Sequence, residues 1–231
     1  MSLFVEGVVQ AIRLLLGGDP DVWQITWLSI QVSATATALS LLVGVPLGAL
    51  LALARFPGRA VAVSLVNTGM GLPPVVVGLF VTILLWRNGA LGALELLYTP
   101  TAMVVGQLVI AAPIVTGLTL AAVQQVPEAF RLQLLGLGAS QSQMIWMLLR
   151  EARLPMLAAV MAGFGGVISE VGASMMLGGN LKGSTRVLTT ATVLETGKGN
   201  FDVAIALSVI LLAITFLVNW ALSWIQQRRP V

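Results

Sequence analysis

The sequence predicts an all-α integral membrane protein with about five transmembrane helices, an N-terminal interfacial helix and one polar segment between two spans. Hydrophobic residues make up 58% of its 231 residues, and charged residues only 9%, far below the roughly 25% typical of soluble domains. Long apolar runs recur along the chain, and basic residues cluster at their ends. We therefore expect residues 1–231 to form a single transmembrane domain.

Cysteine and histidine are both absent from the sequence. Their absence excludes disulfides, thiolate zinc sites and acid–base catalysis by histidine, so we expect no metal site and no catalytic residue. A membrane enzyme would need a nucleophile with a base, and the usual partners are missing. The net charge is only +3, so nucleic acid is not an expected partner.

The first apolar run, at 3–16, ends at a Gly-Gly-Asp-Pro stop and is too short to span a membrane. We expect it to be an interfacial helix, because it also makes a poor signal peptide. The first span is expected at about 27–54, long enough to cross the hydrocarbon core and to tilt. Its Gly44-x-x-x-Gly48 spacing would allow another helix to approach closely, and a dimer contact is one option.

The second span, at about 60–86, is interrupted by Gly69-Met-Gly-Leu-Pro-Pro74. Paired prolines remove backbone donors, so the interruption is compatible with a kink or with a broken helix that lines a cavity. A loop with a short helix at 91–98 follows, and a long polar loop at 178–200 comes later. The remaining spans are expected at about 101–123, 154–177 and 203–225.

The longest polar interruption is the segment at about 127–153. Its helical pattern is too polar for lipid, so we interpret it as a docking element on one side of the membrane. An ordinary amphipathic interfacial helix is the alternative. Five spans place the termini on opposite sides. The side of this segment would hold Arg55, Arg59, Arg131, Arg150, Arg153, Arg228 and Arg229, and the other side Arg13, Arg87, Lys182, Arg186 and Lys198. The positive-inside rule then predicts a cytoplasmic C-terminus and an external N-terminus.

Val126-Pro127 followed by Leu137-Gly138-Ala139-Ser140 resembles the cytoplasmic loop of the permease subunits of bacterial and archaeal ABC importers that use a binding protein. The Glu-Ala-Ala positions of that loop are Leu132, Gln133 and Leu134 here, so its acidic residue is absent. The closing Leu154-Pro155 comes later than is usual. The resemblance implies the permease fold of type I ABC importers.

The resemblance covers nearly the whole chain. Leu72-Pro-Pro-Val-Val-Val-Gly-Leu79 resembles the second-span motif of molybdate-type permeases. The runs at 150–153, 168–173, 178–180, 182–190 and 194–199 are closest to tungstate permeases, and Val171-Gly-Ala stands where molybdate permeases usually have Phe-Gly-Ala. The implied function is that of the permease of a tungstate importer, with molybdate or sulfate as the alternative substrate.

The implied partners are a second copy of the chain, two ATP-binding-cassette subunits that use ATP and Mg²⁺, and an external oxyanion-binding protein. The implied location is the cytoplasmic (inner) membrane. The chain itself would hold no cofactor, because neither Lys182 nor Lys198 lies in the glycine spacing of a P-loop. A secondary transporter would show internal repeats and ion-coupling residues, which we do not find. A membrane scaffold is a further alternative.

Three groups of site residues follow from the resemblance. For coupling to the ATPase we expect Arg131, Leu134, Leu137, Gly138, Ala139, Ser140 and Ile145, with Leu135, Met147 and Leu148 adding apolar docking surface. For the translocation path or gate we expect Asn67, Thr68, Pro73, Pro74, Ser169, Glu170 and Gly172. For contact with an oxyanion or the binding protein we expect Asn180, Ser184, Thr185 and Arg186, unless this is simply a polar loop.

Two of these residues carry specific expectations. Gly138 should permit close approach of another backbone. Glu170 is the one acidic residue predicted inside a span, where a charge costs roughly 2.5–3.5 kcal/mol, so it should be paired, protonated or beside water. A carboxylate would repel an oxyanion. We therefore expect Glu170 to have a structural or gate role, hydrogen-bonded to Ser169 or across a dimer.

Overall fold

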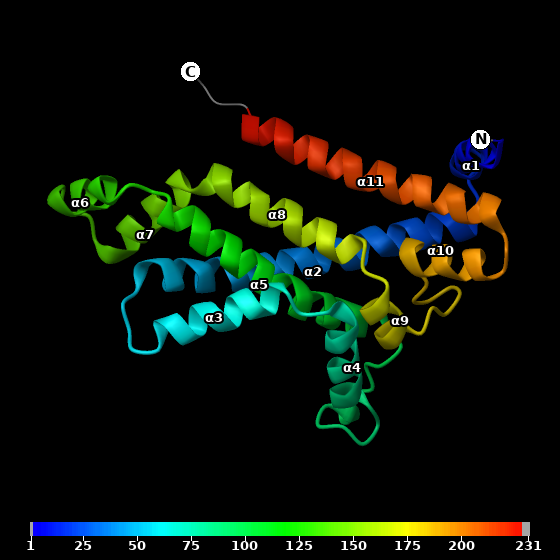
Figure 1. The fold of residues 1–231 in the computed structure, drawn as a ribbon, viewed down its shortest axis with the longest axis horizontal. Coiled ribbons are helices and arrows are strands. Elements are labelled where there is room, and N and C mark those ends of the chain that lie inside the picture. The colour runs from blue at the N-terminus through cyan, green and yellow to red at the C-terminus, as the bar shows by residue number, and fades with distance from the viewer. Residues whose placement is uncertain (1, 228–231) are drawn as a thin grey trace.

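The computed structural model of the protein describes residues 2–227. Helices run along one long axis, with the segment at 127–153 at one end and the loop at 178–200 at the other (Figure 1). No strand occurs within the described range. The α-helices are α1 Ser2–Leu16, α2 Pro20–Leu53, α3 Arg59–Met70, α4 Pro74–Leu85, α5 Pro100–Gln124, α6 Glu128–Gly136, α7 Gln141–Glu151, α8 Arg153–Ile168, α9 Gly172–Gly178, α10 Leu188–Gly197 and α11 Phe201–Gln227, with a 3₁₀ helix at Gly92–Leu94.

Three helices, α2, α5 and α11, are long and apolar enough to cross a membrane. The number rises to five if two bent pairs, α3 with α4 and α7 with α8, each count as one span. Trp23 and Trp27 are exposed on the first turns of α2, and Trp220 and Trp224 on the last turns of α11. Tryptophan is enriched at both surfaces of a bilayer, so these positions fit the two ends of the spanning bundle.

The centre of the bundle is the contact of α2 with α5, against which α8 also packs. Gly44 and Gly48 of α2 face α5. A Cβ atom on Gly44 would lie 2.8 Å from Val115 Cγ1, and one on Gly48 would lie 2.6 Å from the Thr116 carbonyl oxygen. The close approach that this spacing permits is therefore made inside the chain.

The first helix, α1, packs against α11, and Ala11 is buried with Leu207 and Ile210 in their contact. Its 15 residues rise about 22 Å, less than the ~30 Å hydrocarbon core, so α1 does not span a membrane by itself. The predicted helix is confirmed.

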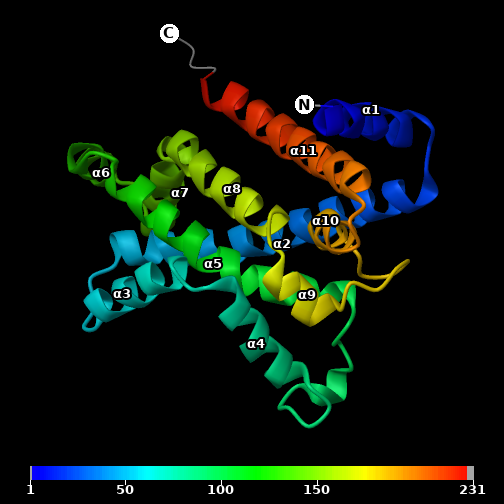
Figure 2. The same cartoon turned by 45° about the vertical axis from the view of Figure 1, so that its right-hand side comes forward.

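The interruption of the second span is a break, since α3 and α4 meet at an angle of 102°. Pro73 caps α4 in extended conformation, and Pro74 is its first residue, where proline's missing N–H costs nothing. In Figures 1 and 2, α4 turns away from the long axis. It packs against α9, where a Cβ on Gly78 would lie 2.8 Å from Ala173 Cα.

Two predictions on the second half of the chain need correction. The continuous span at 154–177 is wrong, because α8 ends at Ile168 and α9 starts only at Gly172. The loop at 178–200 also contains a helix, α10, which packs on α11. Its amide at Leu188 donates to Ser29 Oγ of α2 at 2.8 Å, which fixes the start of α10 on the bundle. Arg228 and Arg229, used above for the topology, lie outside the described residues.

Candidate functional site

The polar segment at 127–153 is a helical hairpin of α6 and α7 rather than one helix. Gly138 lies in the turn with φ +81°, the left-handed region that favours glycine. No atom lies within 4 Å of where its Cβ would be. The expected close backbone approach is therefore not made within the chain, and Gly138 serves the turn itself.

Ser140 starts α7 with a capping box. The Gln143 amide donates to Ser140 Oγ at 3.4 Å, and the Ser140 amide donates to Gln143 Oε1 at 2.8 Å. These bonds satisfy backbone donors that a helix start leaves open, so the hairpin is defined by its own sequence.

The hairpin has a small core of its own. Leu134, Met144 and Leu148 are buried in it, with Leu53 of α2 and Phe130 packed against them. The expectation that Leu134 and Leu148 offer docking surface is therefore wrong, because both side chains are enclosed by the hairpin and the end of α2.

The exposed apolar surface of the hairpin lies elsewhere. Leu137 at the turn is 85% exposed, and Ile145 on α7 is 38% exposed. The sequence did not single out Leu132 and Trp146, which are 61% and 65% exposed. A periodicity count on α6 and α7 separately would have found them, because each lies on the face opposite the buried leucines.

Two polar side chains lie at the break between α8 and α9. The Ser169 hydroxyl, at the end of α8, donates to the Gly165 carbonyl at 2.7 Å. Glu170 is 8% exposed, and its Oε1 accepts from the Ala173 amide at 2.9 Å. Thr189 Oγ1 of α10 donates to the Glu170 carbonyl at 3.0 Å. The Glu170 side chain thus caps the start of α9, and its backbone carbonyl binds α10. The predicted hydrogen bond between Glu170 and Ser169 is not formed.

The other predicted path residues divide into an exposed and a packed group. Asn67, Thr68 and Pro73 are exposed near the α3–α4 break, as is Ser169 at the α8–α9 break. Gly172 is packed, because a Cβ there would lie 2.6 Å from Val75 Cγ2 at the start of α4. The two helix breaks therefore meet through α4 and α9.

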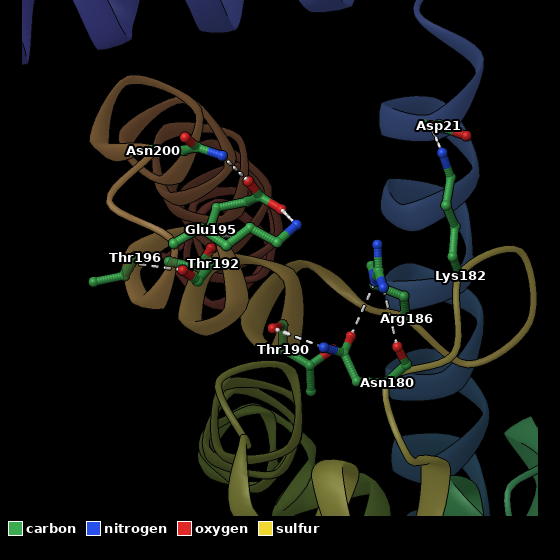
Figure 3. Close-up of polar contacts among 10 residues, drawn as sticks. Asp21, Asn180, Lys182, Arg186, Thr190, Thr192, Glu195, Thr196 and Asn200 are labelled. Carbon is green, nitrogen blue, oxygen red and sulfur yellow. Dashed lines mark hydrogen bonds and ion pairs between the residues drawn. The ribbon is translucent and has the colours of Figure 1, made fainter.

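Three of the four predicted oxyanion donors are occupied by each other or by the backbone, and Figure 3 shows the contacts of Asn180 and Arg186. Arg186 Nε donates to Asn180 Oδ1 at 3.2 Å, and Asn180 Nδ2 donates to the Thr190 carbonyl at 3.4 Å. Thr185 is fully buried and donates to the Gly178 carbonyl. Only Ser184 of the four is exposed. The loop is thus held in shape by its own polar groups.

One ion pair ties this loop to α2, and a second lies within the loop at the end of α10. Lys182 Nζ lies 2.5 Å from Asp21 Oδ2 of α2, and Lys198 Nζ lies 2.7 Å from Glu195 Oε1 (Figure 3). Asn200 also donates to Glu195, and the hydrogen bonds from Asn200 and Lys198 hold the pKa of Glu195 below its usual value.

A hollow of about 350 Å³ lies at this end of the bundle. Its cationic side chains Lys182, Arg186 and Lys198 are matched one for one by Asp19, Asp21 and Glu195. The hollow therefore carries no excess positive charge for an anion. Within the described residues, no group of three or more acidic side chains could hold a metal ion.

Sequence comparisons place the chain among ABC importer permeases. The family model of "Binding-protein-dependent transport system inner membrane component" matches residues 44–230. A probable anion ABC transporter permease protein of Haloferax volcanii is 41% identical, covering 89% of this chain and 91% of that protein. The tungstate uptake system permease protein TupB of Peptoclostridium acidaminophilum is 38% identical, covering 98% of this chain and all of that protein.

Solved structures show the same fold. A chain of the MetNI methionine ABC transporter in an inward-facing conformation matches with a TM-score of 0.72 at 20% identity, over 90% of this chain and 97% of that chain. An amino acid ABC transporter crystallised with histidines matches with a TM-score of 0.68 at 18% identity, over 93% and 97%. At such identities the likeness shows the fold alone. With the family match over most of its length, the chain belongs to the inner membrane components of binding-protein-dependent transport systems, as a multi-pass permease subunit that works with an ATPase and a binding protein.

Proposed function

We propose that this chain is the permease of a tungstate importer. The observation that carries the proposal is its 38% identity to the TupB permease of Peptoclostridium acidaminophilum over 98% of the chain. A second tungstate permease, from Campylobacter jejuni, is 33% identical over 95% of it. The molybdenum permease ModB of Escherichia coli reaches only 26%. The family supplies the transport class, and this difference favours tungstate.

The proposed assembly holds two copies of this chain and two ATPase subunits, which bind ATP and Mg²⁺. An external oxyanion-binding protein delivers the substrate. The hairpin and the C-terminus face the cytoplasm, and the N-terminus faces outward. Arg55, Arg59, Arg131, Arg150 and Arg153 all lie near the hairpin end of the bundle, which supports this orientation.

Coupling in this proposal runs along the chain from α6 to α9. The ATPase docks on the exposed leucines of the hairpin, with Leu137 at its tip. Ala152, which caps both α7 and α8 and is 1% exposed, joins the hairpin to α8 with no loop between them. Motion of the hairpin would therefore reach Ser169 and Glu170 at the far end of α8.

The proposed path passes the two helix breaks. Asn67, Thr68, Pro73, Pro74 and Ser169 offer weak, transient contacts, which suit a pathway better than tight binding. Glu170 acts there through α9 and not as a ligand, since its Oε1 is used as a helix cap. At the outer end, Ser184 and the ion-paired loop around Lys182 form the contact surface for the binding protein.

The test is ATP-dependent uptake into proteoliposomes that contain this chain, its ATPase and its binding protein. Radiolabelled tungstate should enter, and excess molybdate or sulfate should compete poorly. Equal uptake of all three oxyanions would keep the importer and refute the tungstate assignment. ATP hydrolysis without movement of any oxyanion would refute the substrate class.

A further inference from the structure

A second hollow, of about 440 Å³, lies between the last turns of α2 and the coupling hairpin. Its α2 wall includes Val45, Pro46 and Leu50, and its α7 wall includes Ile145 and Leu149. Its volume falls within the range of sites that bind small molecules. Such a hollow suits an elongated apolar group.

This hollow lies beside exposed apolar side chains of α2. Leu50 and Leu47, on the same turns of α2, are 55% and 46% exposed. They belong to a helix that is apolar enough to span the membrane. Side chains so apolar and so exposed on a spanning helix face hydrocarbon, so the hollow can be reached from the bilayer.

The polar end of the hollow is basic. Arg131 and Gln141 are the polar side chains in its lining. Among residues 2–227, the Arg131 guanidinium has no hydrogen bond or ion pair. Arg131 also lines an adjoining hollow of about 400 Å³ with Arg55 and Glu128. The two arginines outnumber the one carboxylate, so the mouth of the hollow favours an anion.

We propose that this hollow binds an anionic phospholipid of the surrounding bilayer. One acyl chain lies along the apolar walls of α2 and α7, and the phosphate contacts Arg131. An amphipathic ligand with one negative head matches both parts of the site, and basic pockets beside spanning helices bind anionic headgroups. Lipid at this position touches Ile145 and Met144 of α7, so its presence would stiffen the hairpin that receives the ATPase.

The first test measures lipid retained by the purified permease–ATPase complex. The complex is extracted from nanodiscs of equal parts phosphatidylglycerol and phosphatidylcholine and examined by native mass spectrometry. The expected result is selective retention of phosphatidylglycerol. Equal retention of both lipids would overturn the proposal. Retention by the permease alone that disappears on assembly would also overturn it, because the ATPase would then occupy the hollow.

A matched pair of variants locates the site. Gln141→Glu and Gln143→Glu add the same charge in the first turn of α7, where an acid is favourable to the helix. Gln143→Glu also keeps the capping box. Of the two residues, Gln141 lines the hollow. We expect Gln141→Glu to lower phosphatidylglycerol retention about fivefold, the factor for one charge near an anionic lipid, and Gln143→Glu to leave it unchanged.

Arg131 provides the complementary test. Arg131→Gln should lower retention by a similar factor, and Arg131→Lys should restore most of it, because the charge is kept. Equal losses in Gln141→Glu and Gln143→Glu would overturn the proposal, since general surface charge would then explain the binding. The proposal does not depend on which oxyanion is transported, so each can fail without the other.

Discussion

The two ends of the molecule differ in which side chains they leave exposed and which they pair. The hairpin of α6 and α7 encloses Leu134 and Leu148 but leaves Leu137 85% exposed at its tip. The opposite end, from α9 to α10, pairs Asn180 with Arg186 and Lys182 with Asp21. The hairpin end exposes apolar side chains to its surroundings. At the opposite end, most polar side chains of the loop are hydrogen-bonded or ion-paired within the protein.

This contrast indicates where the proposed partners would gain binding energy. An exposed apolar tip gains free energy when another protein covers it, so the hairpin has the surface expected of the proposed ATPase interface. A loop whose donors are already hydrogen-bonded gains little from a new polar partner, because each new bond replaces an old one. In the proposed assembly, the far end would therefore act as a preformed surface, whose shape and rigidity matter more than its free donors.

The largest effect should come from the inner side of the hairpin. Leu148→Ala removes a side chain that is 2% exposed, and large-to-small changes in a core cost about 2–5 kcal/mol. Hydrogen exchange should show loss of protection confined to α6 and α7. Leu132→Ala on the exposed face is the control and should change protection little. Equal losses in both variants would break the contrast between the two faces.

The outer side of the hairpin should show the reverse pattern. Leu137→Ser should leave the melting temperature of the permease near that of the wild type. Its affinity for the ATPase should fall roughly ten- to hundredfold, since burial of a leucine contributes about 1.5–3 kcal/mol. Leu91→Ser, at an exposed site outside the hairpin, serves as the control. Undiminished ATPase binding by Leu137→Ser would place the docking surface elsewhere.

The break between α8 and α9 provides a test at the end of the molecule opposite the hairpin. Glu170→Ala leaves the buried Ala173 amide without its partner, which should cost about 1–3 kcal/mol. Glu170→Gln keeps an acceptor oxygen and should recover most of that stability. Thermal unfolding of the two variants measures the difference. Two equally destabilised variants would show that the negative charge, and not the cap, is what the break requires.

The hairpin turn offers a smaller effect. Ser140→Ala removes the hydroxyl that accepts from the Gln143 amide, and loss of an N-cap typically costs about 1 kcal/mol. Ser140→Asp should retain most of the stability, because aspartate also accepts from the backbone. Hydrogen exchange at the start of α7 checks both variants. Wild-type protection in Ser140→Ala would mean that the core of Leu134 and Leu148 holds the hairpin without the cap.

The smallest effect is a pH dependence at the far end. The folded-state pKa of Glu195 is lowered by Asn200 and Lys198. Its contribution to stability is therefore fully present above the unfolded pKa of about 4.3, and it is lost as the pH falls through the lower folded value. Exchange of the amides at 195–200 should rise in that acidic window. Asn200→Ala should shift the rise toward higher pH, and an unchanged profile would contradict this.

The sequence predicted the helices that span alone and the segment at 127–153 as a separate element. Long apolar runs predict α2, α5 and α11 directly. The polar segment that begins at Pro127 stands out because it separates two of the apolar runs. The break at Pro73 also had a local signal. The break at 169–171 had none strong enough, since Ser169 and Glu170 lie in an apolar run and the bonds of Glu170 depend on α9 and α10.

The helix α10 was missed for a related reason. Its threonines favour extended structure when taken one by one, and its start is fixed by Ser29, far away in the sequence. The prediction that Leu134 and Leu148 are exposed was wrong for a similar reason. The sequence pattern indicated one helix at 127–153, whereas the structure has two helices that enclose these side chains. Side-chain exposure depends on which face meets α2, and that is decided by packing.

The length of α2 sets a mechanical condition on the whole molecule. Its 34 residues form one helix of roughly 50 Å. Near one end Gln24 holds Gly183, and near the other Arg59 holds the Leu51 carbonyl. One helix that is held at both ends carries a displacement of either end along the bundle. Pro46 lies inside it and is the point where α2 can bend, because proline removes a backbone hydrogen bond of the helix.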